Sequence, residues 1–236
     1  MLNESLLLSD AQSLGISIND NQIEKFKLLS ELLVEQNKTM NLTAITDADG
    51  IAVKHFADSI SVLSAYDFAE NLKVIDIGTG AGFPGIPLLI MRPDLNLTML
   101  DSTAKKLKYV QSTVNTLGLS AEILHTRAEE AGQNNNYREK YDVVCSRAVA
   151  ALNVLCEYCL PFVKVGGVFI AMKAAKAQEE ISAAKKSVKL LGGEITDIKT
   201  FSLSDGGERN LIIIKKISHI SPKYPRPSAQ ISKKPL

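Results

Sequence analysis

The sequence predicts an α/β protein with a seven-stranded, mostly parallel sheet that ends in an antiparallel hairpin and is preceded by a helical extension. Three observations carry this prediction. From residue 72 onward, apolar runs of strand length alternate with helical patterns, which is typical of parallel strands connected by helices. A glycine-rich turn follows the first of these runs, at residues 76–85. The last two extended runs have no helix between them and therefore predict a hairpin.

Residues 1–71 are predicted to form the helical extension. Apolar residues recur every three or four positions between 23 and 33, and Asn19 or Asp20 can cap the first turn of that helix. A second helical pattern covers about 48–64. We therefore expect this part of the chain to contribute helices and no strands.

The alternating segment, residues 72–217, supplies the predicted sheet. Its strands are expected at 73–77, 96–101, 121–125, 141–146 and 166–172, with helices at about 84–91, 103–117, 150–160 and 175–191. The extended runs of the hairpin are 194–203 and 208–217, joined by a turn rich in Ser, Asp and Gly. The remaining residues, 218–236, contain four prolines and predict an extended tail packed on the core or on RNA.

The net charge of +1 hides a strong asymmetry along the 236 residues. Residues 1–71 carry a net charge of −7, residues 72–214 carry +2, and residues 215–236 carry +6 with no acidic residue. A basic tail is typical of contact with a polyanion such as nucleic acid. The alternative interpretation is a tail that only improves solubility.

Composition narrows the class of protein further. The apolar fraction is 45%, and no apolar run approaches the roughly 18 residues that a membrane-spanning helix needs. The N-terminus lacks the basic region of a secretory signal. Cys145, Cys156 and Cys159 are odd in number and lie in apolar patterns, which predicts reduced core cysteines and no metal site. We expect a cytoplasmic protein, and no feature demands more than a monomer.

The glycine-rich turn predicts a nucleotide-like cofactor at the end of the first parallel strand. Its glycines, Gly78, Gly80 and Gly82, do not keep the spacing of the dinucleotide-binding fingerprint. Asp76 precedes them, and an anion suits a cationic ligand better than a pyrophosphate. We therefore expect S-adenosylmethionine, with Asp76 near its cationic end and Gly78, Thr79, Gly80 and Gly82 along the binding loop. The alternative role for Asp76 is to cap the amides of the loop.

Asp101 ends the second predicted strand, nineteen residues after Gly82. A carboxylate there can accept hydrogen bonds from both ribose hydroxyls of a nucleoside. NAD sites share this feature, so Asp101 indicates that the ligand contains a nucleoside but does not identify the cofactor. A solvated aspartate at a strand end is the alternative.

Three further segments follow predicted strands. Ala128 and Glu129 come after the third strand and are candidates for the adenine ring, although a helix-capping acid is an equal alternative. Arg147 ends the fourth strand, where it can orient the cofactor or a substrate phosphate, and a surface ion pair is its alternative. Lys173 ends the fifth strand and is a weaker candidate for the same role.

Taken together, these segments resemble the RsmG (GidB) family of bacterial 16S ribosomal RNA guanine-N7 methyltransferases. The similarity runs from about Asn37 to Pro235, and its most specific part is the string DIGTGAGFPGIPL at 76–88. Other matching segments are NKTMNLT at 37–43, HFADS at 55–59, Asp101-Ser102 with Lys105-Lys106, RAVA at 147–150 and Tyr224-Pro225-Arg226.

The resemblance implies a class I methyltransferase, Rossmann-like fold with an N-terminal helical extension. It implies that Gly78, Phe83, Ala128, Glu129 and Arg147 contact S-adenosylmethionine. It also implies methylation of N7 of the guanosine at 16S position 527, near the decoding centre. The sequence departs from the family at Ala174, where glycine is usual, and at 226–229, where more basic residues are usual.

Guanine N7 carries an exposed lone pair and needs no deprotonation before it attacks a methyl group. No catalytic base is therefore expected, and the work left is positioning and electrostatics. Candidates for holding the guanine are Arg147 and Lys173. Asn41, His55 and Asp58 of the helical extension are candidates to close over the cofactor, with a packed helix histidine as the alternative for His55.

We expect 16S rRNA or the 30S subunit as partner, with phosphate contacts from Lys105, Lys106, Lys223, Arg226, Lys233 and Lys234. A solvated charge run is the alternative for these residues. Alternative functions are a methyltransferase with a small-molecule or protein acceptor, a non-catalytic S-adenosylmethionine-binding module and a nicotinamide oxidoreductase. The glycine spacing disfavours the oxidoreductase.

Overall fold

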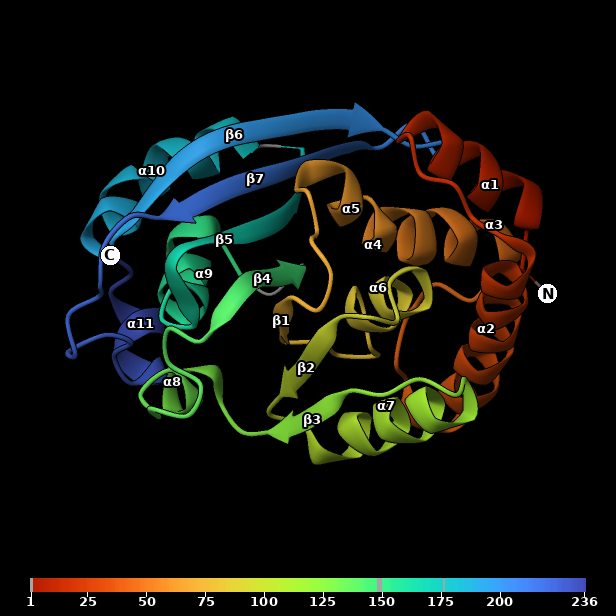
Figure 1. The fold of residues 1–236 in the computed structure, drawn as a ribbon, viewed down its shortest axis with the longest axis horizontal. Helices are drawn as coiled ribbons and strands as arrows, with labels where there is room; N and C mark the ends of the chain where they lie inside the picture. Colours follow the sequence, from red (N-terminus) through yellow and green to blue (C-terminus); the bar gives the residue numbers. More distant parts are fainter. Residues whose placement is uncertain (1, 148–149, 176) are drawn as a thin grey trace.

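A seven-stranded sheet runs through the middle of the protein in the computed structural model, which describes residues 2–147, 150–175 and 177–236 (Figure 1). Its strands are β1 (Lys73–Ile77), β2 (Asn96–Asp101), β3 (Glu122–His125), β4 (Tyr141–Arg147), β5 (Val163–Ala174), β6 (Gly193–Ser202) and β7 (Glu208–Lys216).

The strand order β3-β2-β1-β4-β5-β7-β6 confirms the predicted sheet. Strands β1 to β5 pair in parallel, while β7 pairs antiparallel with both β5 and β6. The chain order reverses between β1 and β4, and open α/β sheets bind ligands beside such a reversal, at the carboxyl ends of the strands. The fold therefore places a ligand site next to Asp76 of β1.

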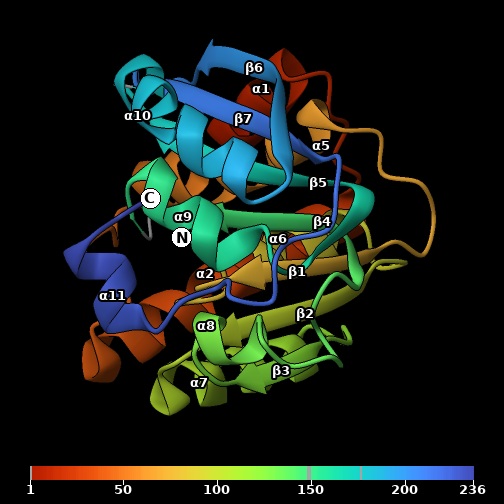
Figure 2. The ribbon, with the colours of Figure 1, turned by 90° about the vertical axis from the view of Figure 1, so that its left-hand side faces the viewer.

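Helices cover both faces of the sheet (Figures 1 and 2). The first six helical segments belong to the N-terminal part: α1 (Glu4–Ser13), α2 (Asp20–Met40), α3 (Ala48–Gly50), η1 (Ile51–Ala57), α4 (Asp58–Ile60) and α5 (Val62–Ala65). The others are α6 (Gly85–Met91), α7 (Ala104–Thr116), α8 (Ala128–Ala131), α9 (Leu152–Cys159), α10 (Ala177–Leu190) and α11 (Ser228–Lys233).

Alternate residues of each strand enter two separate hydrophobic clusters, because successive side chains of a strand point to opposite faces. Val74 lies with residues of α1, α2, η1, α6 and α7, and its neighbour Ile75 lies with residues of α8, α9 and α10. The helical extension therefore shares a hydrophobic cluster with the sheet. Cys145, Cys156 and Cys159 are buried free thiols, as predicted.

The helical extension differs from the prediction at 48–64, which is not one α-helix. Its centre is a π-helix, η1, flanked by short α-helical segments. The wider turn coincides with side-chain donors to its carbonyls, since Arg147 donates to the Lys54 carbonyl at 2.9 Å and Ser59 to the His55 carbonyl at 2.5 Å. Arg147 donates from a distant strand, which helical periodicity does not reveal, whereas Ser59 donates from the next turn of the same helical segment. π-turns frequently occur at functional sites.

The tail, 218–236, is packed against the core, one of the two placements expected for it, but it is not extended throughout, because it forms the short helix α11. Tyr224 is buried and Ile231 is fully buried. Arg138 binds the tail's backbone, with donors to the Tyr224 carbonyl at 2.7 Å and the Ile220 carbonyl at 3.1 Å. Two apolar anchors and these hydrogen bonds offset the extended preference of the prolines.

No helix in the described part of the chain is long and apolar enough to cross a membrane.

Candidate functional site

The glycine-rich turn joins β1 to α6 at the carboxyl edge of the sheet. The amides of Gly78 and Thr79 donate to the Leu100 carbonyl of β2 at 2.8 and 3.0 Å, which fixes the turn against its neighbouring strand. Gly78, Gly80 and Gly82 have φ angles of +74°, +59° and +91°. Side chains strongly disfavour this region, so the shape of the turn depends on its glycines.

Two sides of the turn differ in how tightly they are packed. A Cβ atom added to Gly85 would lie 2.7 Å from the Met99 sulfur, so the inner side has no room. A Cβ atom on Gly80 would have only one neighbour within 4 Å, the Gly78 carbonyl oxygen at 3.9 Å. The turn therefore forms a tightly packed base with an open side that a ligand can approach.

Asp76 lies fully buried beneath this turn, with one carboxylate oxygen occupied and the other unpartnered among the described residues. Its Oδ2 accepts the Gly85 amide at 3.0 Å, so the capping role is real for that oxygen. Oδ1 and the nearby Thr79 hydroxyl are buried without a partner. Burial raises the pKa of Asp76 to about 6, and the Gly85 amide only partly offsets it.

Asp101 ends β2 on the other side of the turn. Its Oδ2 accepts the Gly80 amide at 3.0 Å and its Oδ1 accepts the Thr103 amide at 2.8 Å. Each oxygen keeps a second lone pair, so the carboxylate shapes the loop and can still accept from a ligand hydroxyl. Asp101 is buried and is not the solvated strand-end residue of the alternative interpretation.

Two predicted cofactor residues follow β3 in the short helix α8. Ala128 begins α8 and Glu129 lies next to it, and both are half-buried. Arg127 lies 3.9 Å from the Glu129 carboxylate, so the acid is paired only loosely.

A cavity of about 440 Å³ lies beside β4, β5 and β7, at the carboxyl ends of β4 and β5. Four cationic side chains line it against two acidic ones, Asp58 and Glu180: the cations are Lys54, Arg147, Lys173 and Arg209. This net positive charge suits an anionic substrate. A larger cavity of about 920 Å³ is lined by the opposite, amino ends of β1 to β3, away from Asp76 and Asp101, so we place the candidate site at the smaller one.

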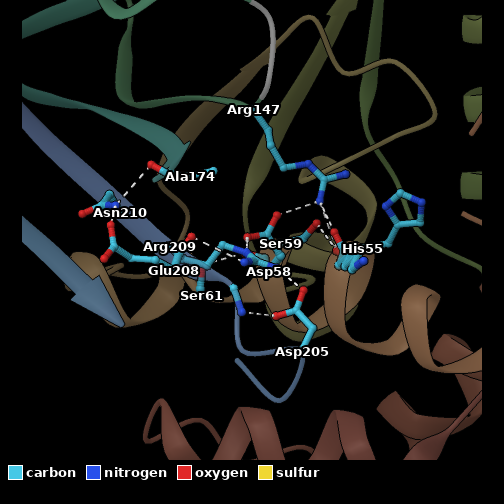
Figure 3. A network of polar contacts seen from close by, with 12 residues as sticks. His55, Asp58, Ser59, Ser61, Arg147, Ala174, Asp205, Glu208, Arg209 and Asn210 are labelled. Carbon is cyan, nitrogen blue, oxygen red and sulfur yellow. Dashed lines mark hydrogen bonds and ion pairs between the residues drawn. The ribbon is translucent and has the colours of Figure 1, made fainter. Parts of the chain in front are cut away.

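A carboxylate shared by two arginines forms one wall of this cavity (Figure 3). Asp58, at the start of α4, accepts from Arg147 at 3.0 Å on Oδ2 and from Arg209 at 3.1 Å on Oδ1. Arg209 also donates to Asp205 at 2.9 Å. The guanidinium of Arg147 lies 5.1 Å from the centre of the Phe83 ring. Helical extension, β4 and β7 therefore meet at Asp58.

His55 is a packed histidine that also lines the cavity. Its ring stacks on Phe83 at 4.7 Å, and its Nε2 lies 2.8 Å from the Thr43 hydroxyl. Asn37 holds the Thr43 backbone through its amide group. Burial and the positive charge of Arg147 lower the pKa of His55 to about 4, so the ring is neutral at pH 7.

Lys173 and Glu180 form the other charged wall. The Lys173 ammonium donates to the Ala150 carbonyl at 2.7 Å and forms an ion pair with Glu180 at the same distance. Ala174, the departure from the family pattern, is exposed beside them, and its carbonyl accepts from Asn210 at 3.2 Å (Figure 3).

The remaining predicted residues lie away from this cavity. Asn41 is exposed and ends α2 in a left-handed conformation, and it is not among the described residues that line the cavity. Lys223, Lys233 and Lys234 are exposed, as is Lys105 at the start of α7, while Lys106 is half-buried.

Arg226 differs from the predicted RNA contact, because its guanidinium is committed to an ion pair. It donates to Glu157, a buried side chain of α9, at 2.8 and 2.6 Å. We assign it an anchoring role for the tail.

Among the charged side chains that line the cavity, sequence reasoning missed Lys54, Glu180 and Arg209. Each reaches the cavity from a segment distant in the sequence, and no local motif marks any of them. The motif that carries Arg147 continues into 148–149, which lie outside the described residues.

The donor set fits S-adenosylmethionine, which combines cationic groups with a ribose. An unpartnered buried carboxylate oxygen and hydroxyl, at Asp76 and Thr79, suit a cation. Asp101 keeps acceptor capacity for hydroxyls, and Gly80 leaves the loop open between them. No group of three or more His, Cys, Asp or Glu side chains in the described ranges is arranged to hold a metal ion.

Comparisons with known proteins agree with this geometry. The model of the family described as rRNA small subunit methyltransferase G (GidB) matches residues 22–212. The chain is 48% identical to ribosomal RNA small subunit methyltransferase G of Acetivibrio thermocellus, over 98% of this chain and 96% of that protein. It is 44% identical to the protein of the same name from Alkaliphilus metalliredigens, over the full length of both.

Solved structures show the same fold at low sequence identity. The chain is similar to M. jannaschii TYW2 in complex with AdoMet, with a TM-score of 0.51 and 17% identity over 65% of this chain and 73% of that one. It is also similar to TrmN from Thermus thermophilus, with a TM-score of 0.52 and 15% identity over 67% of this chain and 48% of that one.

Proposed function

This chain belongs to the rRNA small subunit methyltransferase G family of S-adenosylmethionine-dependent enzymes, and we propose that it methylates N7 of a guanine in 16S ribosomal RNA, at position 527 near the decoding centre. The observation that carries the proposal is the juxtaposition of two features at one sheet edge. A carboxylate-lined glycine turn lies beside a cationic cavity that is lined by residues of β4, β5 and β7.

Residues of the turn and of the two neighbouring strand ends suit the parts of the cofactor, in order along the sheet edge. We assign Asp76 and Thr79 to the cationic end, Asp101 to the ribose, and Ala128 with Glu129 to the adenine. Gly78, Gly80, Gly82 and Phe83 form the loop beside them, and Arg147 lies over Phe83. When bound, the cofactor supplies a methyl group that is activated by a positively charged sulfur.

The acceptor atom fits the protonation states of the cavity. His55 is neutral at pH 7, Asp58 is held by two arginines, and Glu180 is held by Lys173. Guanine N7 needs no base, because its lone pair is already exposed, so none of these side chains has to remove a proton. The chain's contribution is then to hold the base in line and to exclude water.

The substrate must present N7 outside a regular duplex, since the major groove of A-form RNA is too deep and narrow for access. We propose that exposed Lys105, Lys223, Lys233 and Lys234, with the half-buried Lys106, contact phosphates around such a site. We further propose that the protein acts as a monomer on 16S rRNA or 30S particles in the cytoplasm.

Incubation with methyl-labelled S-adenosylmethionine tests the proposal. The protein is offered 30S particles and naked 16S RNA from cells that lack this modification, and the labelled nucleotide is mapped. We expect one guanine, labelled at N7, and preference for one of the two substrates identifies the form that is recognised. Label on protein or on small molecules, with none on guanine N7, would overturn the proposal and support the alternative acceptor class.

A further inference from the structure

We infer that Lys173 and Glu180 together recognise the Watson–Crick edge of the target guanine, so that this ion pair selects guanine over adenine. The inference rests on the proposed function and assigns base specificity within the same site. The inference depends on neither the cofactor-binding turn nor Arg147.

The two side chains approach the cavity from different elements. Lys173 lies near the end of β5, and Glu180 lies in the first half of α10. Their side chains are 9% and 28% exposed and are joined at 2.7 Å. Both line the cavity that also contains Arg147. The pair is therefore fixed in place and accessible from the site.

The hydrogen bonds already made leave one donor and one acceptor beside each other. Of the three N–H groups of the Lys173 ammonium, one reaches the Ala150 carbonyl and one reaches Glu180. Glu180 Oε2 accepts from Lys173 and from the Leu152 amide at 2.7 Å. Its Oε1 accepts from no residue in the described ranges. What remains is one ammonium N–H next to one carboxylate oxygen.

This pattern is the complement of guanine. Guanine presents the acceptor O6 beside the donors N1–H and N2–H₂, whereas adenine presents the donor N6–H₂ beside the acceptor N1. The Lys173 ammonium matches O6, and Glu180 Oε1 matches N1–H and N2–H₂. Against adenine both contacts would be mispaired, and buried polar groups left without a partner discriminate strongly. Holding the Watson–Crick edge also leaves N7 uncovered.

The other carboxylate that lines the cavity is less suited to this contact. Both oxygens of Asp58 already accept from guanidinium groups, Oδ1 from Arg209 and Oδ2 from Arg147, so a base bound there would share its acceptor with an arginine. Among the described acidic side chains of the cavity, Glu180 is the one with an oxygen that accepts from no other described residue.

Inosine provides the decisive probe, because it keeps O6, N1–H and N7 but lacks the N2 amino group. 30S particles or 16S RNA carrying guanosine or inosine at the target position are offered to the wild type, to Glu180→Gln and to Lys173→Met. We expect the wild type to favour guanosine over inosine by roughly 10- to 100-fold in kcat/KM, the effect of one hydrogen bond to a charged group.

The ratio of kcat/KM for the guanosine substrate to that for the inosine substrate distinguishes base recognition from a purely structural role. Glu180→Gln should bring the guanosine-to-inosine ratio close to one, because the Leu152 amide binds the carboxamide oxygen and leaves the NH₂ group, a donor, toward the base. Lys173→Met should slow both substrates and keep the wild-type ratio, since both bases carry O6. Any intrinsic difference in N7 reactivity is the same for all enzymes and cancels. A Glu180→Gln enzyme that is slower on both substrates at an unchanged ratio would overturn the inference.

Glu179→Gln is the matched control, because Glu179 is the exposed neighbour on the same helix and makes none of these contacts. It should behave as the wild type. Failure of the wild type to methylate any guanine N7 contradicts the proposed function, whereas an unchanged ratio in Glu180→Gln contradicts this inference alone.

Discussion

At the scale of single residues, the buried carboxylate of Asp76 lowers the stability of the folded protein but leaves an oxygen available to the cofactor. One of its oxygens orders the turn through the Gly85 amide, and the other is buried without a partner in the described chain. Burial raises its pKa from 3.8 to about 6, so the ionised form is disfavoured in the folded protein. A cationic ligand group beside Asp76 would stabilise the negative charge that burial disfavours.

Replacing Asp76 by Asn should therefore stabilise the protein and weaken cofactor binding. The folded-state pKa lies above the unfolded one, so the wild type loses stability as the pH rises from about 4 through 6. Asp76→Asn avoids this loss and should have a higher free energy of unfolding above pH 6, by at most about 3 kcal/mol, with no gain near pH 4. Denaturant unfolding between pH 4 and 8 measures the difference.

The same variant should bind S-adenosylmethionine roughly 10- to 100-fold more weakly at pH 7.5, as measured by calorimetry. Asp197→Asn, at an exposed position of β6, is the control and should change neither quantity. Unaltered cofactor affinity in Asp76→Asn would contradict the role assigned to its free oxygen.

At the scale of elements, the π-helix η1 and the start of α4 connect the helical extension to the sheet. Their Asp58 joins Arg147 of β4 and Arg209 of β7, while the hairpin turn supplies Asp205 to Arg209 (Figure 3). Three segments are thereby held at one side chain, which fixes the cationic wall of the cavity.

Asp58→Asn should lower both stability and turnover, because an amide cannot satisfy two guanidinium groups. We expect a loss of about 1–3 kcal/mol in the free energy of unfolding and a lower kcat for methyl transfer. Asp205 pairs with Arg209 but not with Arg147, so Asp205→Asn should cost less in both measurements. An Asp205→Asn variant that loses as much as Asp58→Asn would contradict the bridging role.

The contact between α9 and the tail predicts that substitutions of its two partners cost unequal amounts of stability. Glu157 is fully buried, whereas the Arg226 side chain is 20% exposed. Arg226→Ala leaves a buried carboxylate unpaired and should cost about 3–5 kcal/mol in the free energy of unfolding. Glu157→Gln leaves a guanidinium that can reach water and should cost less. Equal losses in denaturant unfolding would contradict this account.

At the scale of the whole molecule, the basic C-terminal segment, residues 215–236, is divided between anchoring and exposed charges. Lys216 is fully buried and donates to the Leu160 carbonyl at 2.8 Å, and Arg226 is committed to Glu157. Lys223, Lys233 and Lys234 remain exposed. Helix α11, which ends at Lys233, lies on the same side of the protein as α8 and α9 (Figure 1). Only the exposed lysines are available to an RNA backbone.

A double substitution, Lys233→Ala with Lys234→Ala, should weaken RNA binding in a salt-dependent way. If both lysines contact phosphates, the slope of log affinity against log salt should fall by about 1–2. Lys185→Ala with Lys186→Ala, at exposed positions of α10, is the matched control. Removing the whole tail would be a poorer test because it also deletes the fully buried Ile231. An unchanged slope would show that the tail's lysines are only solvated.

Much of the fold and half of the site could be predicted from the sequence, for a physical reason. Alternating apolar periods report strand and helix directly, and the glycine turn between Asp76 and Gly85 is local in the chain. A parallel sheet then aligns its strand ends, so Asp76, Asp101, Arg147 and Lys173 had to lie along one edge. The family resemblance also depended on such local strings.

What the tertiary structure decided are the pairings between distant segments. Arg209 and Asp58 are 151 residues apart, and the sequence gives no local signal that joins them. The same holds for Glu180 with the helix start at Leu152, and for Arg226 with buried Glu157. Local periodicity determines which face of an element is apolar, but which charges meet across elements depends on how the whole sheet and its helices pack. Local patterns were therefore enough to predict the cofactor edge with Arg147 and Lys173 beside it, whereas packing between distant elements brought Glu180 and Arg209 to the cavity and anchored the tail.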